Sequence, residues 1–298
     1  MKQEFPLEER IYGSNAEQVT ALIRRVYRWD VRIVLALLKA FGRSPFDFWV
    51  VDENERLVGT TLVTYGARAG FLSTVSVHPD FRRRGFAQAL LARSHEGIRR
   101  SRRPYAILEV IRDNVPARAL YARAGYRPLR SNTVLTREPD PGDRDRPRPK
   151  VPGLRALRRE DAPALVTVAN ATQSPELREW MPFTREQFFL PPLLASSVDA
   201  VSRAWVLEEG GRAVAFLRAT VGGLTHTAHL TQPIFAPEVS ALSARALVDT
   251  ALAWVATERP ARSVVELPED RPAARAVLEE AGFQPVLQLD TLGLDLGT

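Results

Sequence analysis

The chain has 298 residues, of which 45% are hydrophobic and 26% charged, a composition that excludes an intrinsically disordered protein. This length is enough for two domains, each with its own core. The sequence contains no cysteine, which excludes disulfides, thiolate metal sites and a cysteine nucleophile. No apolar run reaches the ~18–20 residues of a membrane span, and the first residues lack the order of a secretory signal, so we expect a cytoplasmic protein without a membrane span.

The net charge of +6 is distributed unevenly. Residues 1–150 contain 28 Lys and Arg against 17 Asp and Glu, whereas residues 151–298 contain 13 against 18. The basic half would attract an anionic ligand, or the two halves would attract each other. Charge alone does not choose between these interpretations.

Apolar periodicity and turn signals divide the first half into alternating helices and strands. The predicted elements, in chain order, are helices over 14–27 and 31–41, strands over 48–52, 57–65 and 71–77, a helix over 86–98, a strand over 105–111, a helix over 116–124 that stops at Gly125, and a final strand. This order predicts a mixed α/β fold in which helices pack on a sheet.

A proline-rich stretch separates the halves. Residues 139–153 contain five prolines, alternating charges and almost no apolar side chains, which predicts a stiff linker that joins no core. We therefore predict an N-terminal domain over 1–138, a linker over 139–153 and a C-terminal domain over 154–298.

The C-terminal half repeats the N-terminal one at a constant offset. Adding 157 takes Leu90 to Leu247, Glu109 to Glu266, Arg118 to Arg275, Gly125 to Gly282 and Pro128 to Pro285, with no gap. Chance explains such an offset poorly, so the chain is predicted to be two copies of one fold.

The first stretch with chemical content joins a strand to a helix. It reads Phe-Arg-Arg-Arg-Gly-Phe-Ala from Phe81 to Ala87. A helix N-terminus offers N–H groups without helical partners and a positive dipole end, and Gly85 permits close approach of an anion. No Gly-Lys-Ser/Thr follows, and the three-glycine dinucleotide fingerprint is lacking. The stretch favours pyrophosphate binding, while a solvated basic loop and a nucleic-acid patch stay open.

The second stretch lies on the next strand and helix and contains Glu109, Asn114, Tyr121 and Gly125. Two of these residues also have a purely structural interpretation. Tyr121 sits mid-helix where any apolar residue would serve, so it reads equally as a core tyrosine. A strand glutamate such as Glu109 is often solvated or salt-bridged.

Together the two stretches resemble the GNAT superfamily of acyl-CoA-dependent N-acyltransferases. The family's Arg/Gln-x-x-Gly-x-Gly/Ala loop is similar to Arg82-x-x-Gly85-x-Ala87. Its later motif is similar to a set made of Asn114, Ala117, Leu120, Tyr121, Gly125 and Tyr126. The pattern looks most like the branch that acetylates the N-terminal alanine of proteins. The resemblance covers residues 45–137 and implies two tandem GNAT-like domains.

The resemblance also implies an enzyme that moves an acetyl group from acetyl-CoA, its co-substrate, to a primary amine of a small molecule or a peptide, by direct attack in a ternary complex. Tyr121 would be the acid and Glu109 the base, directly or through water. The implied coenzyme-binding residues are Val75, Ser76, Val77, Arg82, Arg83, Arg84, Gly85, Phe86, Ala87, Gln88 and Asn114.

The second copy lacks these residues at the same offset. Arg82–Ala87 becomes Val239–Ala244, without cations or glycine, and Tyr121 becomes Leu278. Residues 154–298 are therefore predicted to be a degenerate GNAT-like domain.

Other functions fit the sequence less well. A non-catalytic module that senses acyl-CoA or binds a partner is the main alternative, and a nucleic-acid binder using Arg99–Arg103 is a weaker one. His226 and His229 would face opposite sides of a strand, so no metal is expected. The sequence leaves a homodimer open.

Overall fold

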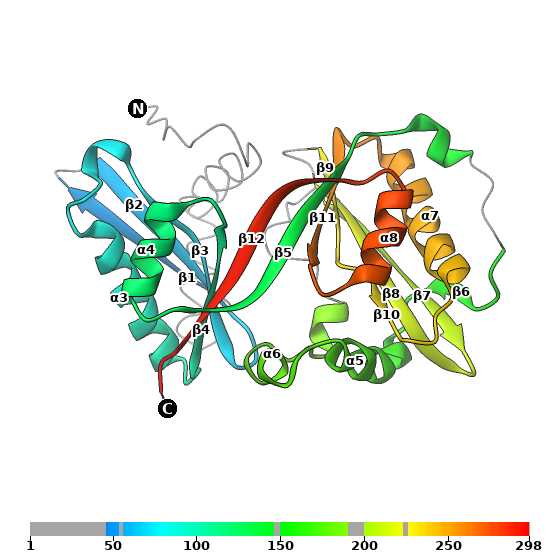
Figure 1. Ribbon diagram of the computed structural model, residues 1–298, viewed down its shortest axis with the longest axis horizontal. Coiled ribbons are helices and arrows are strands. Elements are labelled where there is room, and N and C mark those ends of the chain that lie inside the picture. The colour runs from blue at the N-terminus through cyan, green and yellow to red at the C-terminus, as the bar shows by residue number, and fades with distance from the viewer. Residues whose placement is uncertain (1–45, 54–55, 146–149, 190–199, 223–225, 298) are drawn as a thin grey trace, which may run out of the picture. The chain divides into compact units, whose positions relative to one another are not determined.

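The computed structural model describes residues 46–53, 56–145, 150–189, 200–222 and 226–297. The helices predicted over 14–27 and 31–41 lie outside these residues. The chain divides into two compact units (Figure 1). Unit 1 consists of Met1–Leu129 and Asp290–Thr298, and unit 2 of Arg130–Leu289.

Unit 1 is a mixed sheet with two described helices. Its strands lie in the order β1-β2-β3-β4-β12, where β1–β3 are antiparallel and β4 is parallel to β3. The elements are β1 (Phe46–Glu53), β2 (Arg56–Tyr65), β3 (Ala69–Val77), the short 3-10 helix η1 (Pro79–Phe81), α3 (Phe86–Arg100), β4 (Tyr105–Ile111), α4 (Val115–Arg123) and the end of β12 (Gln284–Asp295). The described elements agree with the sequence-based prediction to within a few residues.

Unit 2 has the strand order β5-β11-β9-β8-β7-β6, and β10 pairs with β8 off this path. Its strands are β5 (Arg127–Arg137), β6 (Leu154–Ala156), β7 (Val201–Glu209), β8 (Arg212–Gly222), β9 (Thr227–Leu230), β10 (Ile234–Phe235) and β11 (Arg262–Pro268). Strand β5 belongs to this unit from Arg130 onward. Its helices are η2 (Pro141–Arg144), η3 (Arg159–Asp161), α5 (Ala162–Ala171), α6 (Pro175–Trp180), η4 (Glu186–Phe188), α7 (Ala241–Glu258) and α8 (Pro272–Glu280).

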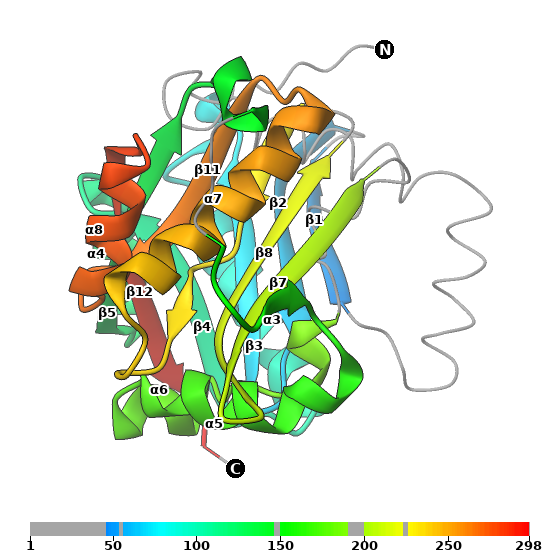
Figure 2. The same cartoon turned by 90° about the vertical axis from the view of Figure 1, so that its right-hand side faces the viewer.

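The sheet of unit 2 separates two apolar clusters because successive strand side chains point to opposite faces. Ala215, Leu217 and Ala219 of β8 pack with α7 and α8. Phe216, between them in sequence, packs on the other face with Leu165 of α5. Figure 2 shows α7 crossing the strands of this unit.

The two halves repeat the same elements at the predicted offset of 157. β4 becomes β11 and α4 becomes α8, with matching first and last residues. The strand register repeats as well, because Leu62 pairs with Ser73 as Ala219 pairs with Leu230. Gly125 and Gly282 both follow their helix with φ near 90°, a backbone angle that favours glycine. The prediction of two copies of one fold is confirmed.

Each unit is completed by the last strand of the other half. Residues 132–137 of β5 pair with β11 in unit 2, and β12 lies next to β4 in unit 1. Leu292 and Leu296 of the C-terminal segment join the core that contains Leu108 and Val110. The boundaries of the compact units therefore differ from those of the sequence halves 1–138 and 154–298. The division into homologous halves stays a prediction about the repeat.

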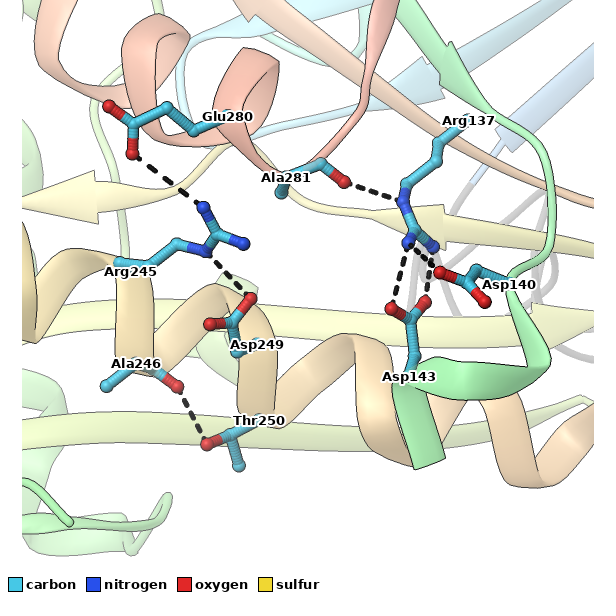
Figure 3. Close-up of polar contacts among 9 residues, drawn as sticks. All are labelled: Arg137, Asp140, Asp143, Arg245, Ala246, Asp249, Thr250, Glu280 and Ala281. Carbon is cyan, nitrogen blue, oxygen red and sulfur yellow. Dashed lines mark hydrogen bonds and ion pairs between the residues drawn. The ribbon is translucent and has the colours of Figure 1, made fainter. Parts of the chain in front are cut away.

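The start of the predicted linker is anchored in unit 2 (Figure 3). Asp143 of η2 is only 5% exposed and accepts hydrogen bonds from both terminal nitrogens of the buried Arg137, one at 2.9 Å. The Nε of Arg137 donates to the carbonyl of Ala281 at 2.7 Å. A buried carboxylate is tolerated when it is paired in this way. The expectation that no part of 139–153 joins a core is therefore wrong for Asp143.

Candidate active site

The sheet of unit 1 splits between β3 and β4. The two strands pair only from Ala69 to Leu72 on β3. A bulge follows, with Thr74 at φ 55° and a register shift against β2, and such bulges bend the strand that carries them. A cavity of about 520 Å³ opens beyond this point.

Most of the residues predicted to bind the coenzyme line this cavity. They are Val75, Ser76, Val77, Arg82, Arg83, Gly85, Phe86, Ala87, Gln88 and Asn114, together with Tyr121, the predicted acid. Phe81, Pro116, Ala117, Leu120 and Arg123 line it too and were not predicted to bind the coenzyme, although Phe81, Ala117 and Leu120 belong to the two stretches that carry the resemblance. Pro116, Leu120 and Arg123 follow one another at spacings of four and three, and Ala117 precedes Tyr121 by four, a helical pattern that was present in the sequence.

The basic end of the cavity is the start of α3. Gly85, at φ 85°, is the N-cap and provides no side-chain hydrogen bond to the helix. The first N–H groups of a helix have no acceptor within it, and here Arg82, Arg83 and Arg123 add positive charge around the cavity. Nε of Arg82 also donates to the carbonyl of Val77 at 3.2 Å. This end of the cavity is suited to an anion.

Arg84 lies elsewhere. Its guanidinium donates to both carboxylate oxygens of Glu53, at 2.9 and 2.5 Å, and lies 5.3 Å from the ring centres of Phe81 and Phe86. These contacts pin the loop to the end of β1. Binding of pyrophosphate by Arg84 stays a prediction.

Tyr121 is both a core residue and a cavity residue. Its side chain is 6% exposed, and its ring meets Tyr126 edge-on with centres 5.9 Å apart. Burial raises the pKa of Tyr121 to about 12. The phenol therefore keeps its proton at neutral pH and can donate a hydrogen bond into the cavity.

Glu109 is exposed and does not line the cavity. It alternates along β4 with Leu108 and Val110, which pack in the same cluster as Tyr121, so its side chain points to the opposite face of the sheet. Oγ1 of Thr291 donates to its Oε1 at 3.5 Å. The structure thus places Glu109 and Tyr121 on opposite faces of the split sheet and does not bring them together.

Two further side chains hold α4 in place. Oδ1 of Asn114 accepts from the N–H of Ala117 at 3.2 Å and caps the helix. The carboxylate of Asp290 accepts from Arg112 at 3.2 Å and from Arg118 at 2.5 Å, which ties α4 to the end of β4. Asp290 was missed, since its counterpart at the offset is Thr133 and no motif marks it.

Comparison with known proteins identifies this region. Residues 44–128 match the family model for the GNAT acetyltransferase domain. This part of the chain is similar to a GNAT domain. It is 30% identical over 88 residues to proteins named acetyltransferase from Yersinia pestis strains. The match covers 30% of this chain and 62% of the length of those curated relatives.

Solved structures show that the likeness in fold extends beyond the GNAT domain. A tandem GNAT protein from the clavulanic acid biosynthesis pathway aligns with a TM-score of 0.61 and 21% identity, over 85% of this chain and 83% of that one. A GCN5-related N-acetyltransferase from Sphaerobacter thermophilus aligns with a TM-score of 0.57 and 14% identity, over 90% and 86%. The fold is therefore that of a tandem GNAT protein.

Unit 2 differs from the GNAT domain where the site would be. Ser240 caps α7 by accepting from the N–H of Ser243 at 3.1 Å, whereas α3 has no such cap. Leu278, the counterpart of Tyr121, is fully buried. These differences support the prediction that the second copy is degenerate.

Two general findings concern membranes and metals. Within the described residues, no helix has the length and apolar character needed to cross a membrane. In the same part of the chain, no group of three or more His, Asp or Glu side chains is placed to hold a metal ion. The cytoplasmic location stays a prediction.

Proposed function

We propose that unit 1 transfers the acetyl group of acetyl-CoA to a primary amine of a small molecule or a protein N-terminus, with both substrates bound. One observation carries this proposal. Within a GNAT domain, the cavity at the split of β3 and β4 joins an uncapped, arginine-rich helix start at one end to a buried tyrosine hydroxyl at the other.

The residues around the cavity fit the coenzyme. The start of α3 with Arg82 and Arg83 would hold the diphosphate. Beyond Leu72, β3 is no longer paired with β4, so the backbone of Val75–Val77 offers an edge to which the pantetheine arm can add like a strand. When bound, acetyl-CoA supplies an acyl group activated as a thioester.

In the proposed reaction a nitrogen–carbon bond forms and the carbon–sulfur bond breaks. Glu109, or water held by it, takes the proton that the ammonium must lose, from the face opposite Tyr121. A backbone N–H of Val75–Val77 donates to the carbonyl oxygen as it gains charge. Tyr121 donates a hydrogen bond to the departing sulfur, and the thiolate takes up the second proton that the nitrogen loses on becoming an amide.

The raised pKa of Tyr121 refines its role. A phenol with a pKa of about 12 is a weak acid toward a thiolate whose conjugate acid has a pKa of about 8.5. Complete proton transfer to sulfur is therefore unfavourable by roughly 3–4 pKa units. Tyr121 thus stabilises the developing thiolate mainly as a hydrogen-bond donor.

A single pair of variants tests the proposal. Tyr121→Phe should lower kcat roughly a hundredfold, in line with the loss of one donor to a developing charge. Its affinity for coenzyme A should stay within about twofold because the ring remains. Tyr126→Phe is the matched control, since Tyr126 is equally buried and bonds His95 at 2.9 Å but does not line the cavity. Thiol release from acetyl-CoA with a panel of amines is the assay, and equal turnover of both variants and the parent would refute the role of Tyr121.

A non-catalytic acyl-CoA sensor is the second candidate, favoured by the separation of Glu109 from Tyr121. It predicts coenzyme binding without turnover on any amine. Of the cluster Arg99–Arg103, on which the nucleic-acid alternative depends, Arg99 and Arg103 donate to the carbonyls of Leu296 and Gly66 within unit 1.

A further inference from the structure

Unit 2 has a cavity of its own, of about 270 Å³. It lies on the face covered by α5, because Phe188, Phe216 and Ile234 belong to the cluster around Leu165. Its lining residues are Phe183, Gln187, Phe188, Phe216, Leu230, Thr231, Gln232, Ile234 and Glu266.

The cavity lies at the counterpart of the split in unit 1. β9 ends at Leu230 and β10 begins at Ile234, so the strand breaks where β3 has its bulge. Ile234 pairs with Phe216 as Val77 pairs with Gly59 at the offset of 157. Glu266 is the counterpart of Glu109. The second copy therefore has its cavity on the face that bears this glutamate, whereas the cavity of unit 1 lies on the face of Tyr121.

The opposite face of the split does not suit a coenzyme. Leu278 and Ala274 of α8 are buried there, and α7 is capped by Ser240. Arginine and lysine are absent from the residues that line the described cavity. A diphosphate would find no partner charge in this cavity.

The lining instead has the features of an ammonium site. The rings of Phe183 and Phe188 lie 6.3 Å apart at 29°, and Phe188 meets Phe216 at 5.0 Å and 86°. Aromatic faces attract cations, and the guanidinium of Arg218 already lies 5.7 Å from the ring of Phe216. Among the described lining residues, Glu266 is the only charged one.

Hydrogen bonds hold both the carboxylate of Glu266 and the segment that carries Gln187 and Phe188. Nδ2 of Asn132 donates to Oε1 of Glu266 at 2.6 Å, and a carboxylate can accept several further bonds. Arg218 is buried and donates to the carbonyls of Gln187 and Phe188. These bonds tie the guanidinium to the segment that carries Gln187 and Phe188, and the carboxylate of Glu266 is the charged group among the described lining residues.

We propose that unit 2 binds a small primary amine with an apolar body in this cavity, with the ammonium paired to Glu266 and the body against the phenylalanines. The volume falls just below the ~300–1,000 Å³ of usual ligand sites, so the ligand has about one ring. No group is transferred there. The inference does not depend on catalysis by unit 1.

Calorimetry on the full chain without acetyl-CoA tests the proposal. The three probes have a similar phenyl body and differ in whether they carry an ammonium, a hydroxyl or a carboxylate. Phenethylamine should bind at least tenfold more tightly than 2-phenylethanol, and phenylacetate should not bind, because its charge is repelled by Glu266. Glu266→Gln should weaken phenethylamine at least tenfold and change 2-phenylethanol by less than twofold. Glu109→Gln, the matched change in unit 1, should leave phenethylamine binding in place.

The preference for the amine over the alcohol is measured on the parent chain, and the two variants then distinguish a site in unit 2 from one in unit 1. Equal affinity for the amine and the alcohol, or no heat with phenethylamine, would overturn the proposal. Amine binding that survives Glu266→Gln and is lost in Glu109→Gln would also overturn it, by locating the amine in unit 1. None of these results bears on turnover of acetyl-CoA.

Discussion

Deleting residues 290–298 should unfold unit 1 and leave unit 2 folded. Leu292 and Leu296 are 5% and 9% exposed, and burying each leucine contributes about 1.5–3 kcal/mol. The charge-assisted bonds of Asp290 to Arg112 and Arg118 add about 1.5–3 kcal/mol. The sum, roughly 5–9 kcal/mol, is comparable to the ~5–15 kcal/mol that stabilises a whole domain.

The deletion is tested by comparing a chain that ends at Leu289 with a control that ends at Leu296. Hydrogen exchange should show that β4 and α4 lose protection in the shorter chain, whereas β7 and β8 keep theirs. Calorimetry should show coenzyme A binding by the control alone. If both chains protect β4 equally and bind coenzyme A with the same affinity, the C-terminal strand is not part of the fold of unit 1.

Two smaller perturbations probe the helix start and the core of unit 1. Gly85→Ala forces a left-handed φ of 85° on a residue with a side chain, although the added Cβ would have only Gln88 Oε1 near it, at 3.8 Å. Urea denaturation should show that the free energy of unfolding falls by about 1 kcal/mol, and coenzyme A should bind several-fold more weakly. The control Gly210→Ala, at φ 55° in open space of unit 2, should leave coenzyme A binding unchanged. The pKa of His95 is lowered to about 4 by burial and then by Arg99, so the neutral ring is favoured in the folded state and its stabilisation is complete above pH 6.5 and lost as the pH falls toward 4. Urea denaturation from pH 7 to 4 should show this slope in the parent and a shallower one in His95→Gln, and equal slopes would contradict the assignment.

The sequence predicted local structure well because local signals determine it. The strand over 105–111 has the predicted bounds, since a run of apolar residues lies between a proline and a turn. The helix after the basic loop begins at Phe86, as predicted, since Gly85 has no Cβ to resist a positive φ. The cavity residues, by contrast, were expected from the resemblance of two motifs to one family.

The exchange of last strands could not be predicted. Leu135 and Leu292 are counterparts at the offset, and both are buried. Because the repeat gives both last strands the same apolar pattern, either strand suits either sheet, and pattern alone does not assign them. The burial of Asp143 was missed for a related reason, because it depends on Arg137 and Ala281, which are brought to it by the fold.

The face of the sheet on which Glu109 lies could have been predicted from the sequence. Leu108 and Val110 flank it on one strand, and strand side chains alternate between faces. What the pattern did not supply was the position of α4, which lies on the face of Leu108 and brings Tyr121 there. A motif can thus name two residues of one reaction and leave open whether they share a cavity.

Two copies of one fold show what the proposed site costs in stability. Unit 2 caps α7 with Ser240, a bond worth about 1 kcal/mol that α3 lacks. Unit 1 also holds Arg83 at φ 64°, which costs roughly 1–2 kcal/mol, and buries the hydroxyl of Tyr121 where unit 2 has Leu278. An anion at the start of α3 would supply the missing helix partner, so ligand binding should recover part of the stability that the uncapped site gives up.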